Sequence, residues 1–132
     1  YLKECELEWE KDAPEFYEFG VVEKSSDKMI GNLCLYPEKE ACELGWIFNR
    51  AFWGKGYCTE AALKIKQFAL ETLGVKKLVA HCDERNLASA RVMEKLGMKK
   101  IWGNGPREYP QTGEKSTEAM YALDIKDDKN EN

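Results

Sequence analysis

A short glycine-containing segment between a strand-like run and a helix-like run carries the clearest chemical signal. It consists of Trp53, Gly54, Lys55, Gly56, Tyr57, Cys58 and Thr59. Glycines permit positive φ and a close approach of the backbone to a ligand. The unpaired amides and the macrodipole of the following helix would attract an anion, and Lys55 would add a full positive charge. The segment therefore predicts a pyrophosphate-binding loop; the alternative is a tight turn in which Thr59 caps the helix.

A second polar segment stands at the start of another predicted helix, again directly after a strand-like run. Asn86 is suited to capping that helix, and Ser89 lies one turn further in. The strands before the two segments should be parallel neighbours, so both segments should open at the same edge of the sheet, where α/β proteins bind ligands. We expect the two segments to form one site, with simple capping by Asn86 as the alternative.

The first part of the chain is typical of a helix followed by a strand meander. Residues 2–12 have a helix-forming composition that ends before Pro14. Strand-like runs follow at residues 16–23, 29–36 and 41–48. Their short links predict antiparallel pairing.

The next part changes to helical periodicity. Apolar residues at three- and four-residue spacing predict a helix over residues 59–73, which Gly74 ends. A strand over 75–81 should lie parallel to the strand over 41–48, because the helix between them acts as a crossover.

A helix over residues 87–96 and strands over 98–103 and 117–125 complete the pattern, with residues 104–115 as a long loop. The predicted fold class is therefore α/β (or α+β). We expect one domain with a mixed, mostly antiparallel central sheet flanked by helices.

Length and composition limit the function classes. With 132 residues, 43% hydrophobic and 33% charged, the chain fits one globular domain, which we place at residues 1–125 with a charged tail at 126–132.

A net charge of −4 argues against nucleic acid binding, and no apolar run is long enough to span a membrane. The five cysteines include no C-x-x-C pair, which argues against a disulfide framework or a metal site and favours the cytoplasm. Because the chain starts at Tyr1 without methionine, we expect a missing N-terminal segment.

Taken together, the two segments resemble a known family. The sequence W-G-K-G-Y-C-T-E-A followed by R-N-L-A-S-A-R-V-M-E-K-L-G-M is similar to the GNAT acetyltransferases, especially their RimJ/RimL-like branch. That branch often carries E-x-G-Y/W before the loop, and here Glu43-Leu44-Gly45-Trp46 stands at matching spacing. The resemblance runs from about residue 16 to residue 125 and would place the family's first strand and helix before Tyr1.

The chain departs from the family pattern at two places. The pattern Q/R-x-x-G-x-G/A maps onto Trp53 through Cys58, so a tryptophan replaces the polar residue while Gly56 keeps the central glycine. Many members carry a tyrosine in the second motif that protonates the departing thiolate, and Met93 stands there in this chain. The resemblance therefore excludes a tyrosine acid at that position.

The resemblance implies a GNAT-like acyl-CoA N-acyltransferase fold and direct acetyl transfer from acetyl-CoA, as co-substrate, to a primary amine. That amine is a protein N-terminus or a small amine such as a polyamine, an amino acid or an aminoglycoside, and a homodimer is compatible with this. The amides of residues 53–59 and Asn86 would hold the cofactor. Amides near Ile47 and Phe48, freed where their strand splays from its neighbour, would bind the thioester carbonyl.

For proton transfer we choose Glu43 as the base and Ser89 as the acid. An ordinary exposed strand glutamate is the alternative for Glu43, and Cys82 and Tyr121 are weaker candidates for the acid. An acetyl-cysteine intermediate on Cys58 or Cys82 is disfavoured, because buried cysteines are usually inert.

Two other functions stay open at this point: a non-catalytic acyl-CoA-binding or sensing module, and a nucleotide-binding domain of another kind. The acceptor pocket would include the predicted loop over residues 104–115 together with Trp102 and Tyr109.

Overall fold

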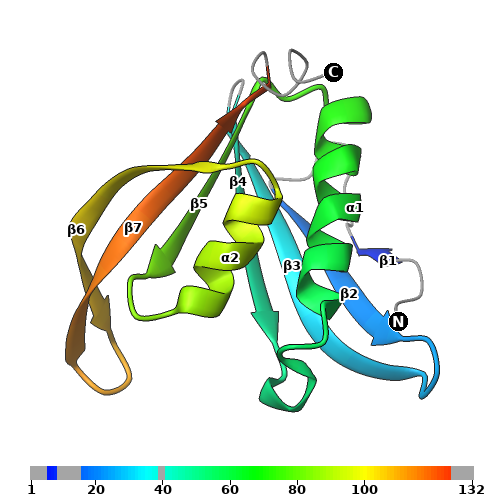
Figure 1. The fold of residues 1–132 in the computed structure, drawn as a ribbon. Coiled ribbons are helices and arrows are strands. Elements are labelled where there is room, and N and C mark those ends of the chain that lie inside the picture. Colours follow the sequence, from blue (N-terminus) through cyan, green and yellow to red (C-terminus); the bar gives the residue numbers. More distant parts are fainter. Residues whose placement is uncertain (1–5, 9–15, 39–40, 126–132) are drawn as a thin grey trace.

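One seven-stranded sheet organises the protein. The computed structural model describes residues 6–8, 16–38 and 41–125, and within them the sheet has the order β1-β2-β3-β4-β5-β7-β6 (Figure 1). The strands are β1 (Glu6–Glu8), β2 (Tyr17–Glu23), β3 (Lys28–Glu38), β4 (Ala41–Phe48), β5 (Lys77–Asp83), β6 (Lys99–Tyr109) and β7 (Glu114–Asp124). The helices are α1 (Tyr57–Glu71) and α2 (Leu87–Lys95), preceded by a short 3-10 turn, Arg50–Phe52. The prediction of one α/β domain with a mixed sheet is confirmed.

The antiparallel meander β2-β3-β4 is confirmed, with bounds close to those predicted. The helix expected over residues 2–12 is wrong at Glu6–Glu8, where the backbone pairs with β2 as an edge strand. Pairing with a free sheet edge here outweighs the weak helical propensity of the sequence. The rest of that range lies outside the described residues.

Strands β4 and β5 are parallel, as predicted, but only over a short stretch. Only the first three residues of β4, 41–43, pair with residues 77–79 of β5. On its other side, β5 pairs with β7 along its whole length. Beyond Glu43 the two strands therefore diverge. Figure 1 shows them separating, with α2 lying over the opening in this view.

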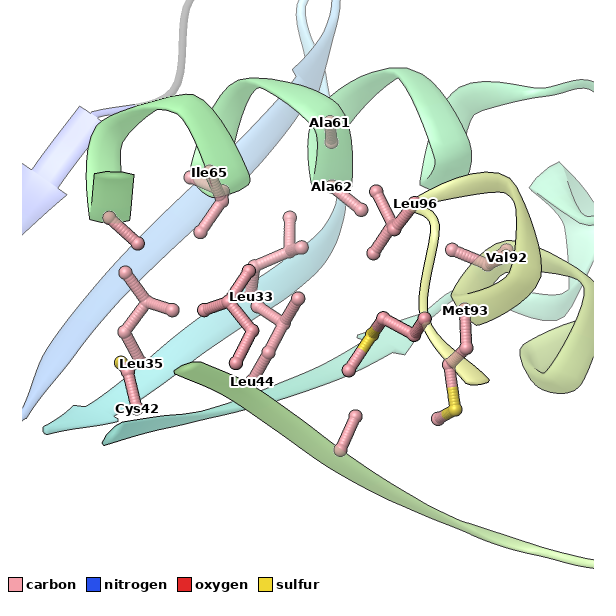
Figure 2. Close-up of a cluster of buried hydrophobic side chains, with 14 of the residues drawn as sticks. Leu33, Leu35, Cys42, Leu44, Ala61, Ala62, Ile65, Val92, Met93 and Leu96 are labelled. Atoms are coloured by element: carbon pink, nitrogen blue, oxygen red, sulfur yellow. The ribbon is translucent and has the colours of Figure 1, made fainter. Parts of the chain in front are cut away.

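Both helices cover the same face of the sheet and form the core with it. Leu33, Leu35 and Leu44 from the strands meet Ile65 of α1 and Met93 of α2, all of them buried (Figure 2). Burial of each such side chain contributes roughly 1.5–3 kcal/mol. This packing fixes the two helix N-termini relative to the end of β4.

The long loop expected at residues 104–115 is wrong, because β6 and β7 continue through most of it to a short turn at Gly113, whose φ is 73°. Strand β6 lies at the edge of the sheet, where Pro106 needs no ladder partner for its missing N–H. Register shifts between Lys100 and Trp102, and between Trp102 and Gly105, accommodate the irregular sequence.

Neither helix in the described part of the chain combines the length and hydropathy that crossing a bilayer requires.

Candidate functional site

The N-terminus of α1 has the geometry of an anion site. Gly56 caps the helix at φ 81° with no side-chain hydrogen bond, and Gly54 before it has φ 75°. The first helical bond joins Glu60 N to Gly56 O, so the amides of residues 57–59 have no partner within the helix. Thr59 lies inside the first turn, so the alternative in which Thr59 caps the helix is wrong.

A cleft of about 470 Å³ opens at this helix end, between the loop, the end of β4 and α2. It brings together most of the residues that the sequence singled out for cofactor binding: Ile47, Phe48, Trp53, Gly54, Gly56, Cys58, Thr59, Asn86 and Ser89. Trp46, which was not among the predicted cofactor-binding residues, also lines the cleft. Neither glycine of the loop has an atom within 4 Å of a Cβ built on it, so the backbone there faces open space. The two separate segments of the sequence thus form one site.

Two predicted loop residues are directed elsewhere. Lys55 Nζ lies 5.4 Å from the centre of the Phe52 ring, and the Tyr57 hydroxyl donates a 2.5 Å hydrogen bond to Glu23. Hydrogen bonds from Ser26 and Tyr57 lower the pKa of Glu23. The side chain of Tyr57 therefore ties α1 to β2, and its amide remains the part that can reach an anion.

The end of β4 presents backbone polar groups to the cleft. Asn49 N donates a hydrogen bond to Ile30 O on β3. Hydrogen-bonded and non-hydrogen-bonded pairs alternate along an antiparallel ladder, so the amide of Ile47, two residues earlier, also faces β3. The polar groups of Phe48 and Trp46 point the other way, into the opening left by β5, and Phe48 O accepts a 2.8 Å bond from Trp53 Nε1. Of the two amides expected to be free, only that of Phe48 faces the opening, and Trp46 supplies a second.

At the start of α2, structural and site roles coincide. Asn86 Oδ1 accepts a 3.0 Å bond from Ser89 N, so the capping interpretation is correct, yet both residues also line the cleft. Ser89 Oγ accepts a 3.3 Å bond from Trp46 Nε1. Met93, at the position where the resemblance leads one to expect a tyrosine, is buried one turn further on.

A second, smaller and polar cavity of about 130 Å³ occupies the gap where β4 and β5 diverge. It shares Trp46, Asn86 and Ser89 with the cleft. His81 lies in its wall, and His81 Nδ1 is 2.9 Å from Glu43 Oε2. The side chain of His81 is 29% exposed and that of Glu43 45%.

The charged groups in this cavity are paired. Asp83 accepts bonds from Arg85, from the Tyr109 hydroxyl at 2.7 Å and from Ser116 Oγ at 3.0 Å. These bonds, that from the Arg85 side chain foremost, hold the pKa of the Asp83 carboxyl well below its usual range. Arg107 is bound to Glu118 at 3.0 Å.

Sequence reasoning missed several residues of the site. Arg91 and Lys95 of α2 line the cleft, and their spacing of four along a helix was the available signal. His81 was not among the predicted site residues; its partner Glu43 lies on a strand predicted to be adjacent to that of His81, and this adjacency was the usable signal. The structure places Tyr109 in the cavity wall and the Trp102 ring 5.7 Å from that of His81.

The two candidate nucleophilic cysteines are held as thiols. Burial raises the pKa of Cys58 to about 12 and also raises that of Cys82. Because the thiolate is the reactive form, this geometry disfavours the acetyl-cysteine alternative.

Comparison with known proteins gives a consistent result. The family model described as "Acetyltransferase (GNAT) domain" matches residues 1–99. YnaD of Bacillus subtilis (strain 168), named as an N-acetyltransferase, is 33% identical over 84 residues, which cover 62% of this chain and 49% of that protein. The chain thus spans about half the length of the curated relatives it matches.

Solved structures show the same architecture. A GNAT-family acetyltransferase from Bacillus anthracis superposes with a TM-score of 0.69 at 28% identity, over 81% of this chain and 65% of that one. The ribosomal-protein-S5-alanine acetyltransferase from Vibrio fischeri gives a TM-score of 0.75 at 20% identity, over 83% and 62%. The microcin C7 self-immunity acetyltransferase MccE, solved with acetyl-CoA and AMP, gives 0.73 at 18%, over 83% and 61%. The last two likenesses show the fold alone.

Proposed function

The chain belongs to the GNAT acetyltransferase family, and on that premise we propose that it transfers the acetyl group of acetyl-CoA directly to a primary amine. The observation that carries this proposal is the N-terminus of α1, which has no side-chain cap and opens on a cleft that meets a polar cavity between the diverging strands β4 and β5. Such an arrangement suits a long phosphorylated donor on one side and a small polar acceptor on the other.

In this proposal the amides of residues 56–59 hold the pyrophosphate, surrounded by Trp53, Gly54 and Lys55. Asn86 holds the pantetheine arm, and the amides of Trp46 and Phe48 bind the thioester oxygen as negative charge develops on it. The arrangement needs no metal ion to neutralise the phosphates. Among the described residues, no group of three or more metal-ligating side chains is present.

The acid and base roles are assigned by position. Glu43 contacts His81 in the wall of the polar cavity and belongs to the base function, while Ser89 lies where cleft and cavity meet and donates a proton to the departing thiolate. A CoA thiolate is already a good leaving group, so the serine contributes modestly.

For the acceptor we propose either the N-terminal amine of a protein, which the RimJ/RimL resemblance suggests, or equally a polyamine or another small amine. The name of the Vibrio fischeri neighbour refers to an alanine acceptor on ribosomal protein S5. We also propose one catalytic domain at residues 1–125 with a tail at 126–132, a cytoplasmic location and a homodimer.

The test is turnover of acetyl-CoA by the protein, with spermidine and an alanine-initiated peptide as acceptors. We expect free thiol to appear together with an acetylated amine identified by mass spectrometry. Absence of acetyl-CoA binding by calorimetry would sink the proposal.

A second candidate, a non-catalytic acyl-CoA sensor, is favoured by one observation: Met93 is buried where many members carry their acidic tyrosine. Tight binding of acetyl-CoA without acetylation of any amine would support this candidate instead.

A further inference from the structure

We propose that His81 is the group that takes the proton from the acceptor amine, and that Glu43 is a positioning residue that acts through it. The inference rests on the proposed function and deepens it, because it names the catalytic base of that same site.

The register of the sheet brings the two side chains together. Glu43 of β4 pairs with Val79 of β5, and His81 follows two residues later on the same face of β5. This face lies opposite the helices, since the neighbours Leu78, Ala80 and Cys82 are buried in the core beneath them. The resulting contact joins Glu43 Oε2 to His81 Nδ1 at 2.9 Å.

This contact selects one form of the imidazole. An ionised carboxylate can only accept a hydrogen bond, so Nδ1 must carry the proton that is donated to Glu43. In the neutral ring Nε2 then holds a free electron pair, which is the form that a general base requires. The Trp102 ring packs beside the imidazole, with 5.7 Å between the two ring centroids.

The position of the ring relative to the two cavities distinguishes the two candidates. His81 lines the polar cavity, whereas Glu43 is not among the described residues that line it. That cavity meets the cofactor cleft at Trp46, Asn86 and Ser89. An amine in the cavity would therefore contact His81 on one side and approach the thioester on the other.

The other charged groups around the cavity are already paired, and Glu43 alone among the described charged residues is in contact with the ring. The groups that face the cavity or its rim are Glu43 from β4, Asp83 from β5, Arg107 and Tyr109 from β6 and Glu118 from β7. Asp83 is bound to Arg85 and Glu118 to Arg107, so those charges are already balanced. Glu43, in contact with the ring itself, stabilises the positive charge that forms there.

The proposed step balances as follows. The ammonium group gives one proton to His81 Nε2, and its freed electron pair forms the C–N bond to the thioester carbonyl carbon while the π electrons of the C=O bond move onto oxygen. The C=O bond then re-forms as the C–S bond breaks with its electron pair on sulfur, and a second proton from nitrogen reaches the thiolate, with Ser89 as the relay. The amide and CoA thiol leave, and His81 releases its proton to water.

The experiment compares His81→Ala, His81→Gln and Glu43→Gln in acetyl transfer to spermidine or the alanine-initiated peptide, whichever the parent uses. We expect His81→Ala to lower kcat by about 100-fold or more, the usual contribution of a general base, with unchanged affinity for acetyl-CoA. Imidazole added to the buffer should restore part of the rate of His81→Ala, because it can occupy the space of the missing ring. Glu43→Gln should lose less and gain nothing from imidazole.

A folded His81→Ala variant with the parental kcat would overturn the inference. A second contradicting result is a loss of kcat in His81→Ala that imidazole does not relieve, together with an equal or larger loss of kcat in Glu43→Gln. His81→Gln, which fills the same space, provides the same comparison of kcat if the alanine variant fails to fold. A parent without turnover would count against the proposed function, whereas an active parent with an active His81 variant would count against His81 alone.

Discussion

The cleft beside the helices and the cavity between β4 and β5 are built on different principles. The cleft uses backbone amides, presented by two positive-φ glycines and a helix without a side-chain cap. The cavity uses side chains, and His81, Asp83 and Tyr109 reach it from two strands that are far apart in sequence. The first construction suits an anion of fixed geometry, and the second suits proton transfer and choice of acceptor. Substitutions should therefore separate binding from turnover.

The largest expected effect is on the cleft. Gly56→Val should weaken acetyl-CoA binding by at least about 100-fold, or about 2.7 kcal/mol. Valine resists the φ of 81° that Gly56 adopts, and its side chain would enter the space of the pyrophosphate. Isothermal calorimetry measures the affinity.

The matched control is Gly113→Val. Gly113 has φ 73° and open space at its Cβ, but it lies in the β6–β7 turn away from the cleft. This variant should carry a similar backbone penalty and keep its affinity. Equal affinity losses in the two variants would show that strain, and not the ligand, explains the effect.

The second prediction concerns the cavity. Glu43→Gln should lower kcat by about 10-fold, because a glutamine holds the imidazole less firmly and supplies no charge to it. Acetyl-CoA affinity should not change. Steady-state kinetics with calorimetry checks both, with the exposed Glu108→Gln on β6 as control. A change in affinity with constant kcat would place Glu43 on the donor side and erase the distinction between the two regions.

Ser89 lies where the two regions meet, and its effect should be smaller. Ser89→Ala should lower kcat about 3-fold, since the thiolate leaves readily without help. It also removes the acceptor of the Trp46 Nε1 bond. Thermal unfolding measured beside kcat separates the two roles: a lower melting temperature with unchanged kcat would leave Ser89 only a packing role.

The smallest effect should come from Lys55. Lys55→Ala should weaken acetyl-CoA binding about 2-fold at low salt, and the difference should fade as salt rises because the charge is exposed and screened. Lys99→Ala on β6 provides the control. A salt-independent loss of 10-fold or more would mean that side-chain charge, and not the amides of the helix end, holds the anion.

The same contrast explains what could be predicted from the sequence. Most of the cleft was predictable because its residues at 53–59 and 86–89 form two contiguous segments, and because local turns and helix starts have recognisable signals. The meander and the parallel crossover were predictable for the same reason. The cavity was not, because it depends on the registers of β4, β5 and β7 and on β6 continuing through Gly105 and Pro106. Composition predicts a loop there, and only the sheet edge makes a strand acceptable.

The position of the free amides at the end of β4 shows the same limit on a smaller scale. Sequence resemblance points to residues near Ile47 and Phe48. It does not say which residues of β4 direct their amides toward β3 and which direct them toward the opening, that is, the phase of the hydrogen-bond ladder. The bond from Asn49 N to Ile30 O fixes that phase, and it directs the amides of Trp46 and Phe48 toward the opening.

An amide-resolved NMR titration with acetyl-CoA would follow every part of the donor site at once. We expect the largest shifts at the amides of residues 56–59, with further shifts at Trp46 and Phe48, and small shifts at Glu43 and His81 until an acceptor amine is added. Large shifts confined to other parts of the chain, or none at the N-terminus of α1, would show that acetyl-CoA does not bind at this helix end.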